Sequence, residues 1–245
     1  LSKFEESNTR KNMRQILGLF EIFRIRQQIK NLLVIIPFLF SLNLWYSNSE
    51  LGQHFLIFSW VIGGVLVFSL ASWAVYLFND VIDADMDLIH ESKKNRPIAR
   101  GTVSKIYAIS ISLILFLGTP ILAFFLGKGF CICISIYLIM NIFYSLLLKK
   151  IVIIDVITVA LGFVIRALSG FFIIRDSGIE SLANLQVSPW FYLCTGFGAL
   201  FIVLMKRQGE LEGSEQTFIT RPTLRMYSPN LLLSLVNISS AATII

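Results

Sequence analysis

The segment from Asn79 to Asp87 concentrates oxygen ligands, since it reads Asn-Asp-Val-Ile-Asp-Ala-Asp-Met-Asp. If the segment is helical, Asn79, Asp83 and Asp87 recur every four residues on one face. Asp80, Asp83 and Asp87 also align, because they are spaced as i, i+3 and i+7. Like charges at this spacing repel, so a divalent cation would offset a cost in stability. Hard oxygen ligands favour magnesium, which takes one or two carboxylates together with substrate phosphates. We therefore predict a magnesium site, in preference to a solvated acidic loop.

A basic set follows the acidic segment at once. Its members are His90, Lys93, Lys94, Arg96 and Arg100. Retention of positive charge on one side of a membrane would explain some of them. The juxtaposition of acidic and basic groups favours a second interpretation, in which magnesium and a phosphorylated ligand bind together.

A second pair of charges lies within the apolar run 152–174, where Asp155 precedes Arg166 by eleven residues, close to three helical turns. Both side chains should therefore share one face of a helix. Ionisable groups inside a membrane are costly and usually functional, although a structural ion pair is the alternative. Gly162 and Gly170 on a nearby face should allow close helix packing.

These residues sit in a chain of membrane-protein composition. Of its 245 residues 56% are hydrophobic and 15% are charged, with a mean hydropathy of +0.75. A soluble domain has about 45–50% apolar and about 25% charged residues, so we exclude a soluble globular enzyme, a disordered tail and a disulfide-stapled module. The net charge of +6 suits a membrane surface or an anionic substrate; nucleic acid is not an expected partner, because the basic residues are spread over several loops.

The apolar runs predict an all-α polytopic bundle. A span needs about 20 apolar residues, and lipid-exposed backbone must satisfy its own hydrogen bonds. Candidate spans are 31–46, 55–78, 104–126, 129–147, 152–174 and 190–205, with a seventh beginning near 230. All Lys and Arg except Lys128, Arg166 and Arg175 precede the first span or lie in loops on that same side. The positive-inside rule therefore places the N-terminus and the charged motifs in the cytoplasm, on a plasma (inner) membrane protein.

The first thirty residues should form a cytoplasmic segment, with 31–245 as the transmembrane catalytic domain. Apolar residues follow helical spacing from Met13 to Phe23 among basic ones, which is typical of an interfacial helix. It could be a simple anchor or take part in catalysis. The sequence begins at Leu1 and stops inside an apolar run, so we expect it to be incomplete at both ends.

Several motifs together resemble the UbiA-type intramembrane transferase superfamily. The pattern Asn-Asp-x-x-Asp-x-x-x-Asp at 79–87 is followed by Arg-Pro-Ile-x-x-Gly at 96–101. Further segments are similar to one branch, the decaprenyl-phosphate phosphoribosyltransferases, and the likeness covers essentially everything after about residue 20. These segments are 23–31, 74–80, 90–101, 162–170 and 190–211.

The resemblance implies a nine-helix bundle with six full spans and a partial seventh in this sequence. It also implies magnesium-dependent transfer of 5-phosphoribose from phosphoribosyl diphosphate to a polyprenyl phosphate of decaprenyl type, releasing diphosphate in cell-wall precursor synthesis. Asn79 and Asp83 would hold the metal, with Asp80 and Asp87 as ligands or close by. The residues carried over for the phosphates and ribose are Lys30, Tyr76, Lys93, Lys149 and Arg166. The catalytic set is Asn79, Asp83 and Arg166, and Asp155 would orient Arg166 or the ribose.

Other functions stay open. Aromatic prenyltransferases of the superfamily carry a second motif of the form Asp-x-x-x-Asp, whereas here Val159 stands four residues after Asp155. This favours a sugar donor over a prenyl diphosphate, although prenyl transfer to an aromatic acceptor remains the first alternative. A transporter of a phosphorylated metabolite is the second, and a purely structural membrane scaffold would need no magnesium. A homo-oligomer is also left open.

Overall fold

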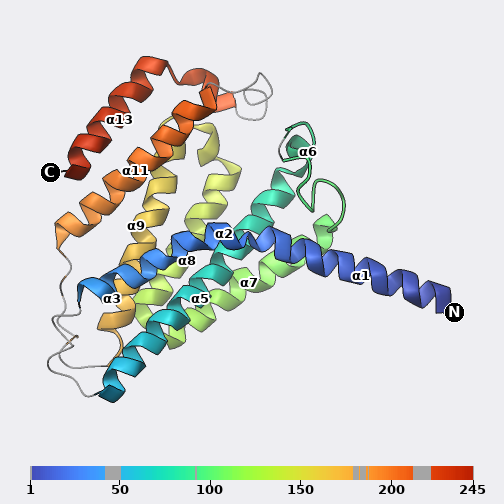
Figure 1. Cartoon of the computed structure of the whole chain (residues 1–245), viewed down its shortest axis with the longest axis horizontal. Coiled ribbons are helices and arrows are strands. Elements are labelled where there is room, and N and C mark those ends of the chain that lie inside the picture. Colours follow the sequence, from blue (N-terminus) through green and yellow to red (C-terminus); the bar gives the residue numbers. More distant parts are fainter. Residues whose placement is uncertain are drawn as a thin grey trace.

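A computed structural model describes residues 2–41, 51–91, 93–178, 182, 186, 188–211 and 222–244, and no β-strand occurs within those ranges. The regular secondary structure of these residues consists of helices joined by turns (Figure 1). The helices are α1 (Ser2–Phe23), α2 (Ile25–Gln28), η1 (Ile29–Ile35), α3 (Ile36–Phe40), α5 (Leu51–Ile82), α6 (Ala84–Asp87), α7 (Lys105–Phe125), α8 (Lys128–Leu146), η2 (Leu148–Lys150), α9 (Ile154–Arg175), α11 (Pro189–Leu211), η3 (Pro222–Met226) and α13 (Pro229–Ile244).

Five of the described helices are long and apolar enough to cross a membrane, namely α5 from Phe55, α7, α8, α9 and α11. They confirm the second to sixth predicted spans. Their outer faces stay apolar: Leu113, Leu117 and Ile121 of α7 are all exposed. A helix that is apolar both inside and outside the bundle belongs in lipid, so the chain forms a multi-pass membrane bundle.

The first and seventh predicted spans differ from that pattern. The chain at 29–40 is a 3-10 helix, η1, followed by the short α3, where the sequence predicted one continuous helix. Pro37 lies in the first turn of α3 and has no N–H to donate to the carbonyl of Leu33, which accepts from the N–H of Ile36 instead. The rest of this span, 42–46, lies outside the described residues. The seventh run forms α13, a shorter apolar helix.

Most helices of the bundle pack against helices that are close to them in sequence. α5 packs against α7, α8 against α9, and α9 against α11, while α13 lies along α11 (Figure 1). The largest core joins η1, α5, α8 and α9 through Val34, Phe68, Ile134 and Ile173. η1 thus packs with one face against α5 and α9, to which it presents Asn31, while Ile29 and Leu32 stay exposed on its other face.

Close contact between η1 and α9 depends on Gly170. A Cβ atom there would stand 2.0 Å from the carbonyl oxygen of Val34, and that oxygen belongs to backbone. The expected close packing at this glycine is therefore confirmed. The same approach brings Arg166, one turn before Gly170, against Asn31 of η1.

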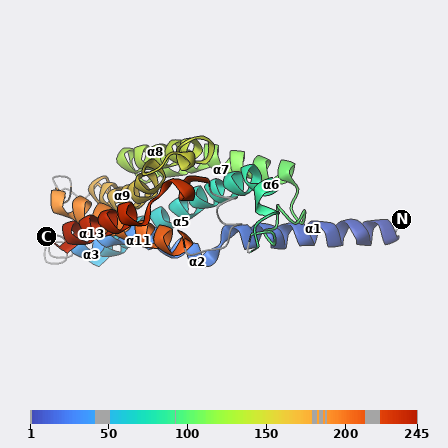
Figure 2. The same cartoon turned by 90° about the horizontal axis from the view of Figure 1, so that it is seen from above.

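Helix α1 projects away from the bundle (Figures 1 and 2). Its inner residues Leu19 and Ile22 pack with Leu77 and Val103, so the C-terminal half is anchored on α5 and the loop that follows it. Met13, Leu17 and Phe20 are exposed on the same helix. These residues form an uncovered apolar face, and the position of α1 at the membrane interface stays a prediction.

Candidate active site

The acidic segment forms where α5 ends. The backbone N–H of Asp83 donates to the carbonyl of Asn79 at 2.9 Å, so the two residues lie one helical turn apart. Asp83 itself separates α5 from α6. Its carboxylate pairs with Lys149 of η2, and the hydroxyl of Ser145 on α8 bonds to the side-chain oxygen of Asn79. Asn79 and Asp83 therefore both face α8 and the turn that follows it.

Asp80 and Asp87 face a different set of partners. Asp80 is buried between Arg24, at 2.6 Å, and Arg96, at 3.1 Å, and Arg96 also binds Asp87 at 2.6 Å. The structure thus divides the single acidic array expected from the sequence into two pairs. Asn79 and Asp83 remain accessible, whereas Asp80 and Asp87 are held by two arginines, which join α1 and the loop after α6 to α5.

Arg24 reaches Asp80 from a break in the N-terminal helix. Its backbone adopts the left-handed conformation, with φ 51° and ψ 60°, between α1 and α2. This conformation is uncommon for a residue with a side chain, and it must be supported by its surroundings. The ion pair with Asp80 and the stacking of the guanidinium over Tyr76, 5.2 Å from its ring centre, supply that support.

A cavity of about 160 Å³ opens beside Asn79, between η1, α5, α8 and α9. Its polar and aromatic walls are contributed by Lys30, Tyr76, Asn79, Tyr137, Asn141, Tyr144, Thr158, Phe163 and Arg166. Four residues predicted for the site from the sequence (Lys30, Tyr76, Asn79 and Arg166) therefore meet around one space. Asp83 and Lys149 lie next to it as an ion pair, because Asp83 is one turn beyond Asn79.

Arg166 is buried among neutral groups. Its guanidinium donates to the side-chain oxygen of Asn31 at 2.9 Å, to the hydroxyl of Tyr137 at 3.0 Å and to the carbonyl of Gly162 at 2.8 Å. It also lies over the rings of Phe68, Tyr137 and Phe163. Among the described residues, no carboxylate lies within salt-bridge distance of it. A buried charge without a counter-ion is costly, which indicates that an anion completes the site.

Lys30 adds a second cation to the same cavity. Its ammonium lies 5.9 Å from the ring centre of Phe163. Burial lowers the pKa of Lys30, and the positive charges of Arg166, Lys206 and Arg24 lower it further. Two neighbouring cations in a partly desolvated space attract a multiply charged anion such as a phosphate or diphosphate.

Besides Lys149, which lies next to this cavity, Lys93 is a predicted substrate residue that does not line it. It lines a second, more open space of about 460 Å³ between α1 and the loop after α6, together with Glu21, Arg24, Asp80 and Arg96. The sequence placed Lys93 in one basic set with its neighbours, but it could not show on which side of Asp80 the loop would fold.

Asp155 does not orient Arg166, which corrects the sequence-based expectation. Arg207 of α11 donates to Asp155 at 3.1 Å, and the hydroxyl of Tyr227 donates to it at 2.5 Å. Eleven residues place two side chains on one face of a helix but about 16 Å apart along its axis, so each finds its own partners.

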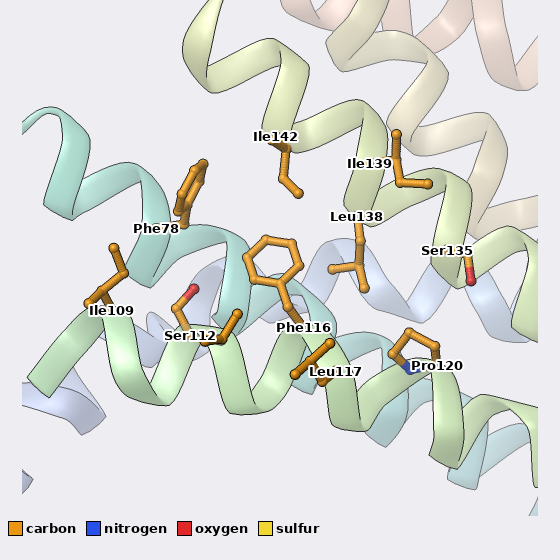
Figure 3. A pocket seen from close by; sticks show the side chains of 11 residues that line it. Phe78, Ile109, Ser112, Phe116, Leu117, Pro120, Ser135, Leu138, Ile139 and Ile142 are labelled. Atoms are coloured by element: carbon orange, nitrogen blue, oxygen red, sulfur yellow. The ribbon is translucent and has the colours of Figure 1, made fainter.

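A third space is apolar and lies between α7 and α8 (Figure 3). Phe78, Phe116, Pro120 and Leu138 are among its walls, and its volume is about 450 Å³. Its two serines are engaged: the hydroxyl of Ser112 donates to the carbonyl of Ala74, and that of Ser135 to the carbonyl of Cys131. These walls suit hydrocarbon, and they place no charge that could act on a phosphorylated substrate.

We call the cavity lined by Lys30 and Arg166 the cationic cavity. The oxygen ligands beside it fit magnesium. Asn79 and Asp83 offer hard oxygens one turn apart, and the Asp83 side chain is 37% exposed. The described residues contain no group of three or more His, Cys, Asp or Glu side chains that could hold a metal ion by themselves. Magnesium commonly binds through one or two protein oxygens and takes its other ligands from substrate phosphates and water.

Several residues of the site escaped the sequence analysis. Asn31, Tyr137, Asn141 and Ser145 are single polar residues in apolar runs, so no spacing marks them. Lys206 was not singled out by the sequence analysis either, yet its charge acts on Lys30. A buried arginine requires hydrogen-bond acceptors, and this requirement is the signal that could have identified Asn31.

Comparison with known proteins agrees with this geometry. The profile of the UbiA prenyltransferase family matches residues 34–211. The decaprenyl-phosphate phosphoribosyltransferase of Mycolicibacterium smegmatis is 30% identical over 233 residues, which cover 94% of this chain and 69% of that protein. The protein of the same name from Mycobacterium tuberculosis is 31% identical over 231 residues, covering 94% of this chain and 72% of that one.

Solved structures show the same fold. A UbiA homolog from Archaeoglobus fulgidus bound to DMAPP and Mg2+ superimposes with a TM-score of 0.71 at 18% identity, covering 93% of this chain and 75% of that chain. The same homolog bound to GPP and Mg2+ gives a TM-score of 0.69, also at 18% identity and with the same coverage. At this level of identity, the agreement concerns the arrangement of helices.

Proposed function

The chain belongs to the UbiA prenyltransferase family and is a membrane-bound transferase, and from that premise we propose that it transfers 5-phosphoribose from phosphoribosyl diphosphate to a polyprenyl phosphate. The relatives named decaprenyl-phosphate phosphoribosyltransferase support this assignment. The observation that carries it is the cationic cavity, which Lys30 and Arg166 line and next to which Asp83 offers a partly exposed carboxylate. Phosphoribosyl diphosphate carries a diphosphate and a separate 5-phosphate. Such a donor needs a metal ion for the diphosphate and cationic side chains for the 5-phosphate.

In the proposed reaction an oxygen of the lipid phosphate attacks the anomeric carbon of the ribose. The bond from that carbon to the diphosphate oxygen breaks, and the diphosphate leaves with the electron pair. The lipid phosphate is already anionic, so the step requires no general base. Catalysis then consists of positioning the two substrates and stabilising charge on the leaving group.

Each residue of the site has a part in this proposal. Asn79 and Asp83 hold magnesium, which supplies charge neutralisation on the donor diphosphate when it is bound. Lys149 keeps Asp83 in place and contacts the diphosphate. Arg166 and Lys30 bind the remaining phosphate, and Tyr76, which lines the cavity next to Arg24, bounds the ribose site. Asp80 and Asp87 act through their ion pairs with Arg24 and Arg96, which fix the end of α5.

We also propose the cellular arrangement that the charge distribution favours. Residues 1–30 form a cytoplasmic segment with α1 at the inner surface of the plasma membrane, and 31–245 form the catalytic domain. α6, η2 and the C-terminal end of α11 lie at one end of the bundle (Figure 1), which is then the cytoplasmic mouth of the site. Phosphoribosyl diphosphate reaches that mouth from the cytoplasm, and the lipid acceptor reaches it from the bilayer, for use in cell-wall precursor synthesis.

The test is a label-transfer assay on membranes that carry the protein. Phosphoribosyl diphosphate labelled in the ribose is supplied with polyprenyl phosphate and magnesium, and label is followed into the lipid phase. We expect magnesium-dependent labelling that Asp83→Asn abolishes. The matched control is Asp85→Asn, two residues away, since Asp85 is 83% exposed and pairs with Lys105 at the surface.

The possible outcomes separate the candidate functions. Turnover of a prenyl diphosphate with an aromatic acceptor, and no label from the ribose donor, would assign the protein to prenyl transfer. Flux of a phosphorylated metabolite without a covalent product would indicate a transporter. Labelling that survives in Asp83→Asn would remove Asp83 from the metal site.

A further inference from the structure

The turn before α9 contains a strained residue. Ile153 has φ 70° and ψ −45°, a conformation that β-branched residues rarely adopt. Such a residue persists only where its surroundings hold it in place, and it is often associated with a functional constraint. The same turn, between α8 and α9, carries Lys149 on η2. Whatever holds Ile153 therefore also limits where Lys149 can reach.

One phenol hydroxyl holds the strained residue. The backbone N–H of Ile153 donates to the hydroxyl of Tyr227 at 2.7 Å, and that hydroxyl donates to Asp155 at 2.5 Å. Arg207 donates to the other carboxylate oxygen of Asp155 at 3.1 Å. We call Tyr227, Asp155 and Arg207, with the Ile153 N–H, the Tyr227 network. Its three side chains are buried, although none of them lines the cationic cavity.

The hydroxyl of Tyr227 remains a proton donor at physiological pH. Burial raises the pKa of Tyr227, and the hydrogen bond to Asp155 raises it further. The phenol therefore stays neutral, so it can donate to the carboxylate and accept from Ile153 at once. Phenylalanine would fill the same space without either bond.

The Tyr227 network is connected along the chain to two lysines near the active site, Lys149 and Lys206. On one side, the turn that contains Ile153 carries Lys149, which pairs with Asp83. On the other side, Arg207 directly follows Lys206, whose charge lowers the pKa of Lys30 in the cavity. Tyr227 itself follows η3, which contacts η2. The network thus links the segment after α11 to the residues that face the donor diphosphate.

We propose that the Tyr227 network sets the position of Lys149 opposite Asp83, and that Tyr227 is a positioning residue for the transferase reaction. The inference rests on the proposed function, because it assigns Lys149 and Asp83 to the donor site. Tyr227 does not touch substrate in this proposal. Its effect on catalysis passes through the turn at Ile153 and requires the ammonium of Lys149.

A double-mutant cycle tests this route. Kinetics are measured for the wild type, Tyr227→Phe, Lys149→Ala and the double variant, with phosphoribosyl diphosphate as the varied substrate. We expect Tyr227→Phe to lower kcat/KM about tenfold, the factor that corresponds to one hydrogen bond. In the Lys149→Ala background the same change should have almost no further effect. A purely structural role for Tyr227 predicts instead that the two losses multiply.

Hydrogen exchange gives a readout that does not depend on activity. Tyr227→Phe should speed amide exchange in residues 148–156, while Tyr107→Phe, a change at an exposed tyrosine of α7, should leave that segment unchanged. Unchanged exchange in Tyr227→Phe would overturn the inference.

The kinetic outcomes separate this inference from the function on which it rests. A wild type without transferase activity would overturn the proposed function and the positioning role of Tyr227 together. An active wild type whose Tyr227→Phe variant has the same kcat/KM would overturn the role of Tyr227 alone. Losses that multiply in the double variant would also overturn it, because Tyr227 would then act independently of Lys149.

Discussion

Two groups of charges flank the end of α5, and they differ in how their charge is compensated. Asp80 and Asp87 are buried with Arg24 and Arg96, so carboxylates and guanidinium groups neutralise each other. Around the cavity, Arg166 is surrounded by amide, hydroxyl and carbonyl groups and by aromatic rings. The first group can be stable without a ligand. The second leaves a positive charge for which an anionic ligand is the natural counter-ion.

The difference teaches how to separate a structural role from a ligand-binding role within one motif. Asn79 and Asp80 are adjacent in sequence, but a step of one residue turns the helix by about 100°, so they serve different faces. Asn79 lines the cavity, and Asp80 anchors α1 and the loop after α6. Replacing residues of the first group should lower stability, whereas replacing residues of the second should lower activity.

Within this comparison of the Asp80 cluster with the cavity around Arg166, the largest expected effect is the loss of activity on replacing Arg166. Arg166→Gln should lower transferase activity by about 10²- to 10³-fold, the range found when one group that stabilises transition-state charge is removed. The thermal midpoint of unfolding should change little, because the removal of a desolvated charge offsets the lost hydrogen bonds. Label transfer and thermal unfolding in detergent micelles measure the two effects. Arg166→Lys, which keeps the charge, should recover part of the activity, and an unstable but fully active Arg166→Gln would reverse the assignment.

The opposite pattern is expected for Asp80. Asp80→Asn leaves Arg24 without its counter-ion and Arg96 with only Asp87, and it should lower the free energy of unfolding by about 2–3 kcal/mol. This value is below that for a fully buried pair because both arginines are partly exposed. Denaturant unfolding measures it, with Asp85→Asn as the control of equal charge change.

Activity in Asp80→Asn distinguishes the two interpretations of the acidic motif. If Asp80 is structural, the transferase activity of the folded fraction of Asp80→Asn should depend on magnesium concentration as the activity of the wild type does. A variant that is as stable as the wild type but inactive would return Asp80 to the metal site that the sequence suggested.

Glycine substitutions test the packing that places Arg166 without changing any charge. The Cβ atom of Gly170→Ala would press on the backbone of Val34, so η1 must move away from α9; overpacking of this kind costs about 1–3 kcal/mol. Activity should fall as well, because η1 carries Asn31 and Lys30. Gly118→Ala on α7 is the control, since nothing lies within 4 Å of its Cβ, and a better helix former should leave stability equal or higher. Equal stability in both variants would contradict the close approach.

The sequence predicted the helices better than it predicted their contacts. Five spans were identified from hydropathy, which averages over a whole helix and tolerates shifts of a few residues. The 3-10 segment η1 was not foreseen, because hydropathy does not distinguish 3-10 from α-helical bonding inside an apolar run. Hydropathy also cannot show that this segment packs against α9 at Gly170.

For the site, spacing predicted the faces of helices but not their partners. Residues that were singled out from distant segments, Lys30, Tyr76, Asn79 and Arg166, line one cavity. Asp155 and Arg166 share a face, as expected, yet three turns separate them, and Arg207 and Tyr227 take the carboxylate instead. Partners of this kind come from other helices, and their identity depends on the packing of the whole bundle. The roles of all these residues remain predictions.

The smallest expected effect concerns how transferase activity depends on pH through Lys30 in the cationic cavity. The pKa of Lys30 is lowered by burial and by neighbouring cations, so Lys30 loses its proton at a lower pH than an ordinary lysine. Activity should fall as the pH rises through that pKa, because the cavity loses one of its positive charges. Stability should change in the other direction: the unfolded chain binds this proton more tightly, so the free energy of unfolding rises with pH there. Lys30→Arg, with a guanidinium that stays charged, should move the fall in activity to higher pH in a pH–rate profile. If the profile of Lys30→Arg coincides with that of the wild type, Lys30 does not supply the charge that binds the donor, and Arg166 alone distinguishes the cavity from the compensated cluster around Asp80.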